Sequence, residues 1–191
     1  INYATGNWIL KANIGKSFRV PIPKELGTDG INYHIFRYEK GNPTLNPEES
    51  YQLDLGLRWG NDKVTVQFDP YLNYFPNYIY MNPTPNYYEG LQWYYYTQSR
   101  VIRSGFELQA NWKICPFLSA EVKGEYLYAE QLSGEKKGYT LPFSTPWSAD
   151  MTLKYDYCQQ KVGNEGFVAL NFHVVGRQNN IVPPEKPTPG Y

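Results

Sequence analysis

The sequence predicts an all-β fold, namely an antiparallel up-and-down transmembrane β-barrel segment that does not close on its own. Three observations predict it. Apolar residues recur at every second position in stretch after stretch, the connections between stretches alternate between short and long, and aromatic residues gather at the stretch ends. Because side chains on a strand point alternately to opposite faces, each stretch has one apolar and one polar face.

Seven stretches carry this alternation and are the expected strands, and no convincing helix accompanies them. The clearest are residues 51–59, 64–74, 106–114 and 149–157, with weaker versions at 8–15, 118–128 and 167–175. In the first clear stretch, Leu55 and Leu57 fall on one face and Asp54 falls on the other. Pro70 lies inside the second, where a proline predicts an edge strand, a bulge or an interruption.

The connections between the stretches alternate in length. Short turns are expected at 60–62, around 115–117 and near 160–165, and long connections at 19–48, 80–92, 133–146 and 178–191. In an up-and-down sheet, all short turns then lie at one end and all long loops at the other. Bacterial outer-membrane barrels have this asymmetry, with short periplasmic turns and long extracellular loops. The expected location is therefore the bacterial outer membrane, in that orientation.

Aromatic side chains make up 17% of the chain and concentrate where strands end. Near the short-turn end these are Trp59, Trp112, Tyr155 and Tyr157, and near the long-loop end they are Tyr51, Tyr74, Tyr126 and Tyr128. Aromatic girdles at the two membrane–water interfaces account for this placement. A soluble β-sandwich also alternates and also uses seven strands. Stretches 64–80 and 94–114, however, run well past the usual length of globular strands.

Composition excludes several classes of function. The chain has 18 basic and 18 acidic residues, so it lacks the net positive charge that favours a nucleic-acid partner. It has 2 histidines, too few for a multi-histidine metal site, and we expect neither a metal nor a cofactor. Cys115 and Cys158 form no metal-binding spacing. Strand spacing separates them by roughly 10 Å, which predicts free thiols.

Two loop motifs carry a family resemblance. The stretch GKSFRVPIPKELG at 15–27 resembles the Phe-Arg-x-Pro…Glu-Leu signature of TonB-dependent outer-membrane receptors, through Phe18, Arg19, Pro21, Glu25 and Leu26. The stretch GNPTLNPEES at 41–50 is similar to another segment of that family, through Gly41, Asn42, Pro43, Leu45, Pro47 and Glu48. Residues 103–112 and 141–157 are similar to two further segments, in the family's order.

This resemblance implies a barrel of about 22 strands, plugged by an N-terminal domain. Residues 1–191 would then be a single partial barrel domain, without the plug and the last strands. The implied function is active import of a scarce nutrient such as an iron–siderophore complex, haem or cobalamin, or a glycan in some branches. The implied partners are outer-membrane lipid, the remainder of the same receptor, the TonB–ExbB–ExbD energy system and a small nutrient ligand. A passive porin-type barrel and a secreted carbohydrate-binding β-sandwich are the alternatives.

No catalytic constellation stands out, so we expect a binding protein and not an enzyme. Aromatic clusters at 73–83 and 86–98 extend into an outer loop, where rings can stack on a planar or sugar-like ligand or pack within the loop. Arginines there can contact an anionic ligand. His173 shares the polar face of its strand with Asn171 and is expected in the lumen. The candidate ligand-binding residues are Arg37, Tyr87, Tyr88, Trp93, Tyr95, Arg100 and His173.

Overall fold

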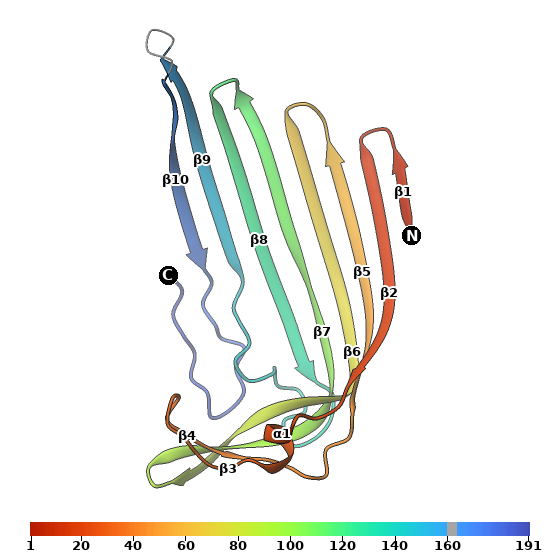
Figure 1. Ribbon diagram of the computed structural model, residues 1–191, viewed down its shortest axis with the longest axis vertical. Coiled ribbons are helices and arrows are strands. Elements are labelled where there is room, and N and C mark those ends of the chain that lie inside the picture. The colour runs from red at the N-terminus through yellow and green to blue at the C-terminus, as the bar shows by residue number, and fades with distance from the viewer. Residues whose placement is uncertain (160–163) are drawn as a thin grey trace.

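The computed structural model describes residues 1–159 and 164–191, and its main feature is one antiparallel sheet with two open edges (Figure 1). In spatial order the strands are β1 (Asn2–Thr5), β2 (Trp8–Arg19), β5 (Glu48–Gly60), β6 (Val64–Tyr88), β7 (Leu91–Cys115), β8 (Leu118–Gln131), β9 (Ser148–Gln159) and β10 (Asn164–Val175). Chain order and spatial order agree, which confirms the up-and-down topology. The seven predicted strands are all present, and a single sheet replaces the β-sandwich alternative.

The connection predicted at 19–48 contains structure that the sequence did not predict. It holds a short helix, α1 (Pro23–Gly27), and the hairpin of β3 (Asp29–Asn32) and β4 (Arg37–Lys40). The expectation of no helix was therefore wrong, although α1 is only one turn long. Among the described residues, no helix has the length and apolar character needed to cross a bilayer.

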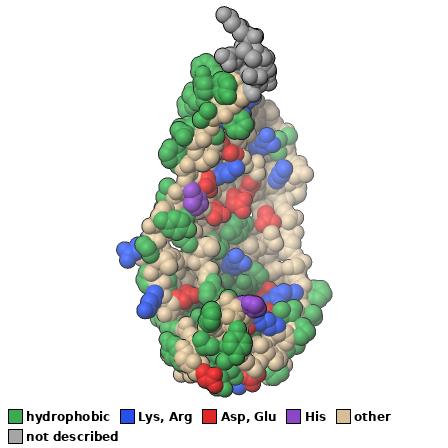
Figure 2. All heavy atoms as spheres, turned by 60° about the vertical axis from the view of Figure 1, so that its left-hand side comes forward, with side chains coloured by type: hydrophobic (Ala, Val, Ile, Leu, Met, Phe, Trp, Pro, Cys, Tyr) green, Lys and Arg blue, Asp and Glu red, His purple; other side chains and the backbone are tan. Residues whose placement is uncertain are grey.

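The two faces of the sheet differ as the alternation predicted. Leu53, Leu55 and Leu57 stay 37–41% exposed on the outer face, which also carries exposed aromatic residues such as Trp112 and Tyr155. Polar and charged side chains line the opposite face, which forms a hollow (Figure 2). A large exposed apolar face on a curved sheet is the pattern of a surface covered by lipid.

Strands β6 and β7 are far longer than predicted. Each has 25 residues, and they meet in a turn at Glu89 and Gly90, both with positive φ. The predicted long loop at 80–92 is therefore a continuation of the hairpin, which bends across the long-loop end of the sheet (Figure 1). The bend coincides with a register shift between Phe75 and Tyr78.

The extended hairpin carries a second small sheet. Strand β4 pairs in parallel with β7 from Tyr38↔Trp93 to Lys40↔Tyr95. We call β3, β4 and hairpin residues 78–99 the cap, and the strands below them, including β6 residues 64–75 and β7 residues 101–115, the wall. The buried hydrophobic clusters lie at the junction of the two; their members are Tyr80, Val101, Ala129 and Leu141 in one, and Leu45, Ile79 and Tyr96 in the other.

Pro70 marks an interruption without a bulge. The β5–β6 pairing stops after Asp54↔Tyr71 and resumes at Leu57↔Phe68 in the same register, while Pro70 still pairs with Phe106 of β7. Proline has no N–H to donate to the ladder, and the two pairs Leu55↔Pro70 and Gly56↔Asp69 are missing from the pairing with β5. Of the three expectations for this proline, the interruption is confirmed.

Candidate functional site

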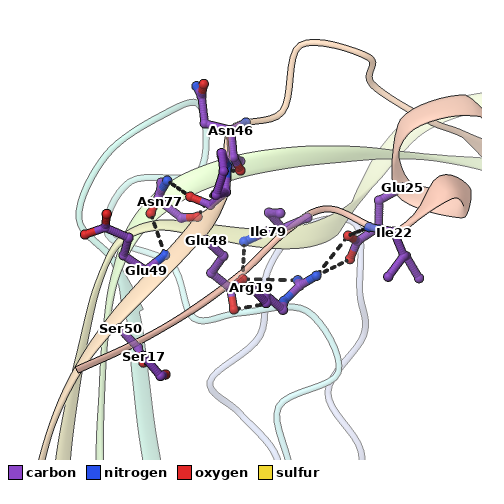
Figure 3. A network of polar contacts seen from close by, with 12 residues as sticks. Ser17, Arg19, Ile22, Glu25, Asn46, Glu48, Glu49, Ser50, Asn77 and Ile79 are labelled. Carbon is purple, nitrogen blue, oxygen red and sulfur yellow. Dashed lines mark hydrogen bonds and ion pairs between the residues drawn. The ribbon is translucent and has the colours of Figure 1, made fainter. Parts of the chain in front are cut away.

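The two loop motifs meet around Arg19, at the end of β2 (Figure 3). The Arg19 guanidinium donates to both oxygens of Glu25 at 3.0 and 2.9 Å, and to both oxygens of Glu48 at 3.1 and 3.2 Å. Glu48 also accepts the backbone N–H of Ile79 at 2.7 Å. A guanidinium fork suits two carboxylates because it can pair with each of them bidentately. The first motif is thus tied to the second, and both are tied to the start of the cap on β6.

The other motif residues shape the chain around this centre. Glu25 accepts the N–H of Ile22 at 3.0 Å and so caps α1, and its carbonyl accepts the N–H of Asn42 at 2.8 Å. Gly41 lies against α1 so closely that a Cβ would stand 2.7 Å from the backbone of Leu26. Leu45 is buried in the junction cluster. The remaining motif residues are Phe18, which is exposed, and the chain-stiffening prolines Pro21, Pro43 and Pro47.

A second ion cluster surrounds Glu39 of β4. This side chain is 2% exposed and accepts contacts from Lys24 at 2.7 Å, Arg37 at 2.8 Å and Asn32 at 3.0 Å. Burial disfavours the charged carboxylate, but the hydrogen bonds from Lys24, Arg37 and Asn32 outweigh burial and lower the pKa of Glu39. The hydrogen bond to Glu39 raises the pKa of Lys24 against the opposing effect of burial. Both groups are therefore charged over the whole neutral range.

Arg37, a predicted ligand contact, is already occupied by protein groups. Its guanidinium carbon lies 4.9 Å from the ring centroid of Tyr94 and 5.6 Å from that of Phe143, in addition to the ion pair with Glu39. Phe143 belongs to the β8–β9 connection, and its N–H donates to Glu185 at 2.9 Å. Arg37 thus joins the cap to the β8–β9 connection, which leaves it little freedom to meet a ligand.

The cap brings several predicted aromatic residues together. Tyr38 packs against Tyr88 with ring centroids 4.5 Å apart and against Trp93 at 5.6 Å. Lys40 lies 5.7 Å above the Trp93 ring. Tyr87 is 67% exposed beside this group. The four residues Tyr38, Lys40, Tyr88 and Trp93 form one cluster, of which sequence reasoning named only two.

Tyr95 joins the cap to the β8–β9 connection. Its hydroxyl donates to Glu135 at 2.7 Å and accepts from Asn82 at 2.8 Å. Burial raises the pKa of Tyr95, and the hydrogen bond to Glu135 adds to this effect. The phenol is therefore neutral at physiological pH, with its face free for packing.

A cleft of about 370 Å³ lies beside these rings. It is lined by Lys40, Gly41, Asn42, Thr84, Asn86, Trp93, Tyr95 and Tyr96. Aromatic faces, amide and hydroxyl groups and a single lysine suit a ring-shaped ligand with polar substituents. Sequence reasoning missed Lys40, Thr84 and Asn86. The alternation of residues 37–40 was the available signal for Lys40, because it places Arg37 and the buried Glu39 on one face of the strand and Tyr38 and Lys40 on the other.

His173 lies in a different place, the hollow of the wall. As predicted, it is on the polar face, where its Nδ1 is 2.7 Å from the carboxylate of Asp150. The hollow measures about 460 Å³ and contains three further carboxylates and one lysine, from Asp69, Glu107, Glu125 and Lys123. Arg100 is exposed and shares the face of β7 that carries Ile102. The predicted ligand residues are thus divided between the cap, the hollow and the outer face.

The two cysteines and the possible metal ligands were also considered in the sequence. Cys115 is a free cysteine, while the side chain of Cys158 lies outside the described residues. Within the described ranges, no group of three or more His, Cys, Asp or Glu side chains is placed to hold a metal ion.

Comparisons with known proteins agree with this geometry. A family model described as TonB dependent receptor-like, beta-barrel, matches residues 1–191. No curated protein matches the chain significantly. Among solved structures, the copper transporter OprC superimposes with a TM-score of 0.78 at 21% identity, covering 100% of this chain and 28% of that chain.

Two receptor structures are also similar. The ferric yersiniabactin uptake receptor FyuA from Yersinia pestis has a TM-score of 0.65 at 16% identity, over 98% of this chain and 26% of that chain. The siderophore receptor PirA from Acinetobacter baumannii has a TM-score of 0.67 at 16% identity, over 100% of this chain and 32% of that chain. The chain therefore spans about a third of these proteins or less, and the likeness establishes the fold.

Proposed function

Because the chain belongs to the TonB-dependent receptor β-barrel family, we propose that it supplies part of the barrel and an extracellular cap of an active transporter in the bacterial outer membrane. The wall would contact lipid through its outer apolar face. The long-loop end, which carries the cap, would face outward, and the short turns would face the periplasm. A plug domain elsewhere in the full-length protein would receive energy from the TonB–ExbB–ExbD system.

The observation that carries this proposal is the position of the cap. An aromatic and polar cleft lies at the end of a sheet whose inner face is a charged hollow. A ligand held by Trp93, Tyr95 and Lys40 would be presented at the mouth of the hollow, and His173 would meet it further along the path. The chemistry is binding and release, without bond cleavage, so we propose a transporter and not an enzyme.

The proposed substrate is a small nutrient with a planar or ring-shaped part. Trp93 offers an aromatic face, Tyr87 and Tyr88 lie at the exposed tip, and Lys40 provides one positive charge. Iron–siderophore complexes and haem meet this description. Among the similar structures, FyuA is named as a ferric yersiniabactin uptake receptor and PirA as a siderophore receptor. Arg37 would serve by holding the cap in shape. Arg100, on the face of β7 that carries Ile102, lies off this path, so its contact with an anionic ligand stays a prediction.

Uptake by the full-length protein tests the proposal. Cells that carry it would be supplied with labelled ferric siderophores, haem, cobalamin, copper and oligosaccharides, with and without TonB. We expect uptake of one class, dependent on TonB, and a loss of affinity of about tenfold for Trp93→Ala through lost stacking. Trp112→Ala, which removes an exposed tryptophan on the outer face, is the matched control and should bind normally. Uptake that is equal without TonB would indicate a passive barrel instead.

A further inference from the structure

Two ion clusters share the short helix α1 through neighbouring residues. Glu25 faces the Arg19 cluster on the wall, and Lys24 faces the Glu39 cluster in the cap. Five residues of helix thus connect two charge networks that belong to different parts of the molecule. The Phe-Arg-x-Pro…Glu-Leu motif includes α1, but none of the named residues of this motif lines the ligand cleft. The cleft therefore gives α1 no role.

The wall side of α1 is firmly held. Glu25 and Glu48 together occupy the Arg19 guanidinium, and Arg19↔Glu48 is also the last register pair between β2 and β5. Glu48 also accepts the backbone N–H of Ile79, at the start of the cap on β6, at 2.7 Å. Helix α1 therefore has a charged anchor at the rim of the wall.

The cap side is held by a chain of contacts that continues past α1. Lys24 pairs with Glu39, and Glu39 pairs with Arg37. Arg37 lies over the rings of Tyr94 and Phe143, which are stacked with centroids 6.1 Å apart. The chain of contacts ends on β7 and on the β8–β9 connection, so α1 reaches the strand that carries Trp93 and Tyr95.

The backbone alone connects the cap to the wall weakly. The β6–β7 ladder shifts register between Phe75 and Tyr78, at the bend between the two parts. In the described part of the chain, β3 and β4 pair with each other and with cap residues of β7, and with no wall strand. A bulge bends a strand and leaves a residue unpaired, so the backbone ladder between cap and wall is interrupted at this junction.

We propose that α1 is a joint that sets the orientation of the cap on the wall, with Arg19, Lys24 and Glu25 as its positioning residues. The joint spans the bend that the backbone ladder leaves weak, and it does so with charged contacts on both sides. All of its contacts are within this chain, so the joint does not depend on the identity of the ligand and goes beyond the proposed transport function.

Distances between paired spin labels on the cap and the wall test the joint in the full-length protein. Cys115 and Cys158 would be replaced by serine, and labels attached at Tyr87→Cys in the cap tip and Leu55→Cys on the outer face of the wall. We expect a narrow distance distribution for this parent. Lys24→Met should widen it by releasing Glu39 from α1, and Arg19→Met should widen it by releasing Glu25 and Glu48.

Two further variants separate positioning from general loss of charge. Lys24→Arg keeps a cation on α1 and should restore the narrow distribution. Lys16 lies on the same strand as Arg19, β2, and forms an ion pair with Glu49 of β5 at 3.1 Å that does not involve α1. Lys16→Met removes this ion pair and should leave the distance distribution unchanged. Folding is checked in each case by the heat-dependent shift in electrophoretic mobility. If folded Lys24→Met and Arg19→Met both keep the parental width, the joint is refuted; if Arg19→Met does not fold, Lys24→Met decides alone.

Discussion

Strands β6 and β7 run through both the wall and the cap, but their two halves are held in different ways. In the wall the apolar side chains point outward and remain exposed, and the backbone ladders provide the cohesion. In the cap and at its junction with the wall, Glu39, Asn82 and Tyr96 are buried and side-chain contacts provide the cohesion. The same pair of strands thus changes from a structure suited to lipid to one suited to water. The cap is therefore the part whose shape depends on charge.

The largest effect should come from a charge on the outer face of the wall. Leu55→Arg in the full-length protein should lower the free energy of unfolding in a bilayer by about 2–4 kcal/mol, because arginine near the middle of a lipid-facing strand is poorly solvated. Urea unfolding in lipid vesicles measures it. Gln52→Arg, on the polar face of the same strand, is the matched control and should be nearly neutral. Equal costs for the two changes would contradict the assignment of the faces.

A smaller effect is expected at the junction. Glu48→Ala removes one of the two carboxylates on Arg19 and leaves the N–H of Ile79 without its acceptor. Because Arg19 keeps Glu25 and is partly exposed, we expect a loss of about 2 kcal/mol of unfolding free energy. Glu49→Ala, at the next residue, removes an exposed ion pair with Lys16 and a long, exposed hydrogen bond from the Tyr51 hydroxyl, and should cost less than about 0.5 kcal/mol. Urea unfolding again measures both, and an equal cost would show that the junction gains nothing from Arg19.

The smallest and most selective effect should be that of pH on the cap. The pKa of Glu39 is lowered from 4.5, so its contribution to stability is complete above 4.5 and is lost as the pH falls through the lower folded value. The pKa of Lys24 is raised from 10.5, so its contribution is complete below 10.5 and is lost as the pH rises through the higher folded value. The label distance between cap and wall should therefore stay narrow from pH 10 down to about 4.5. Widening near pH 6 would contradict this assignment.

How far the sequence predicts the structure differs between the two regions. In the wall, seven strands, their faces and the inward position of His173 all followed from alternation, because a period of two determines the face of every residue. The short turns predicted at 60–62 and around 115–117 are present as well, whereas the turn predicted near 160–165 falls on residues outside the described ranges. In the cap, residues 80–92 were predicted as a loop. Prolines such as Pro83 and Pro85 argue against an inner strand, yet β6 is an edge strand there and tolerates them.

The sequence by itself determined the class of the protein and the order of its motifs. It also identified Arg19, Glu25 and Glu48 as important, but not as partners. Only the tertiary structure decided that Arg37 pairs with Glu39 and lies over the rings of Tyr94 and Phe143, instead of remaining free for a ligand. The physical reason is the range of the interactions. Alternation is a local property that each strand carries in its own residues, whereas the charge of an arginine is neutralised by whichever carboxylates and rings the fold brings to it from distant segments.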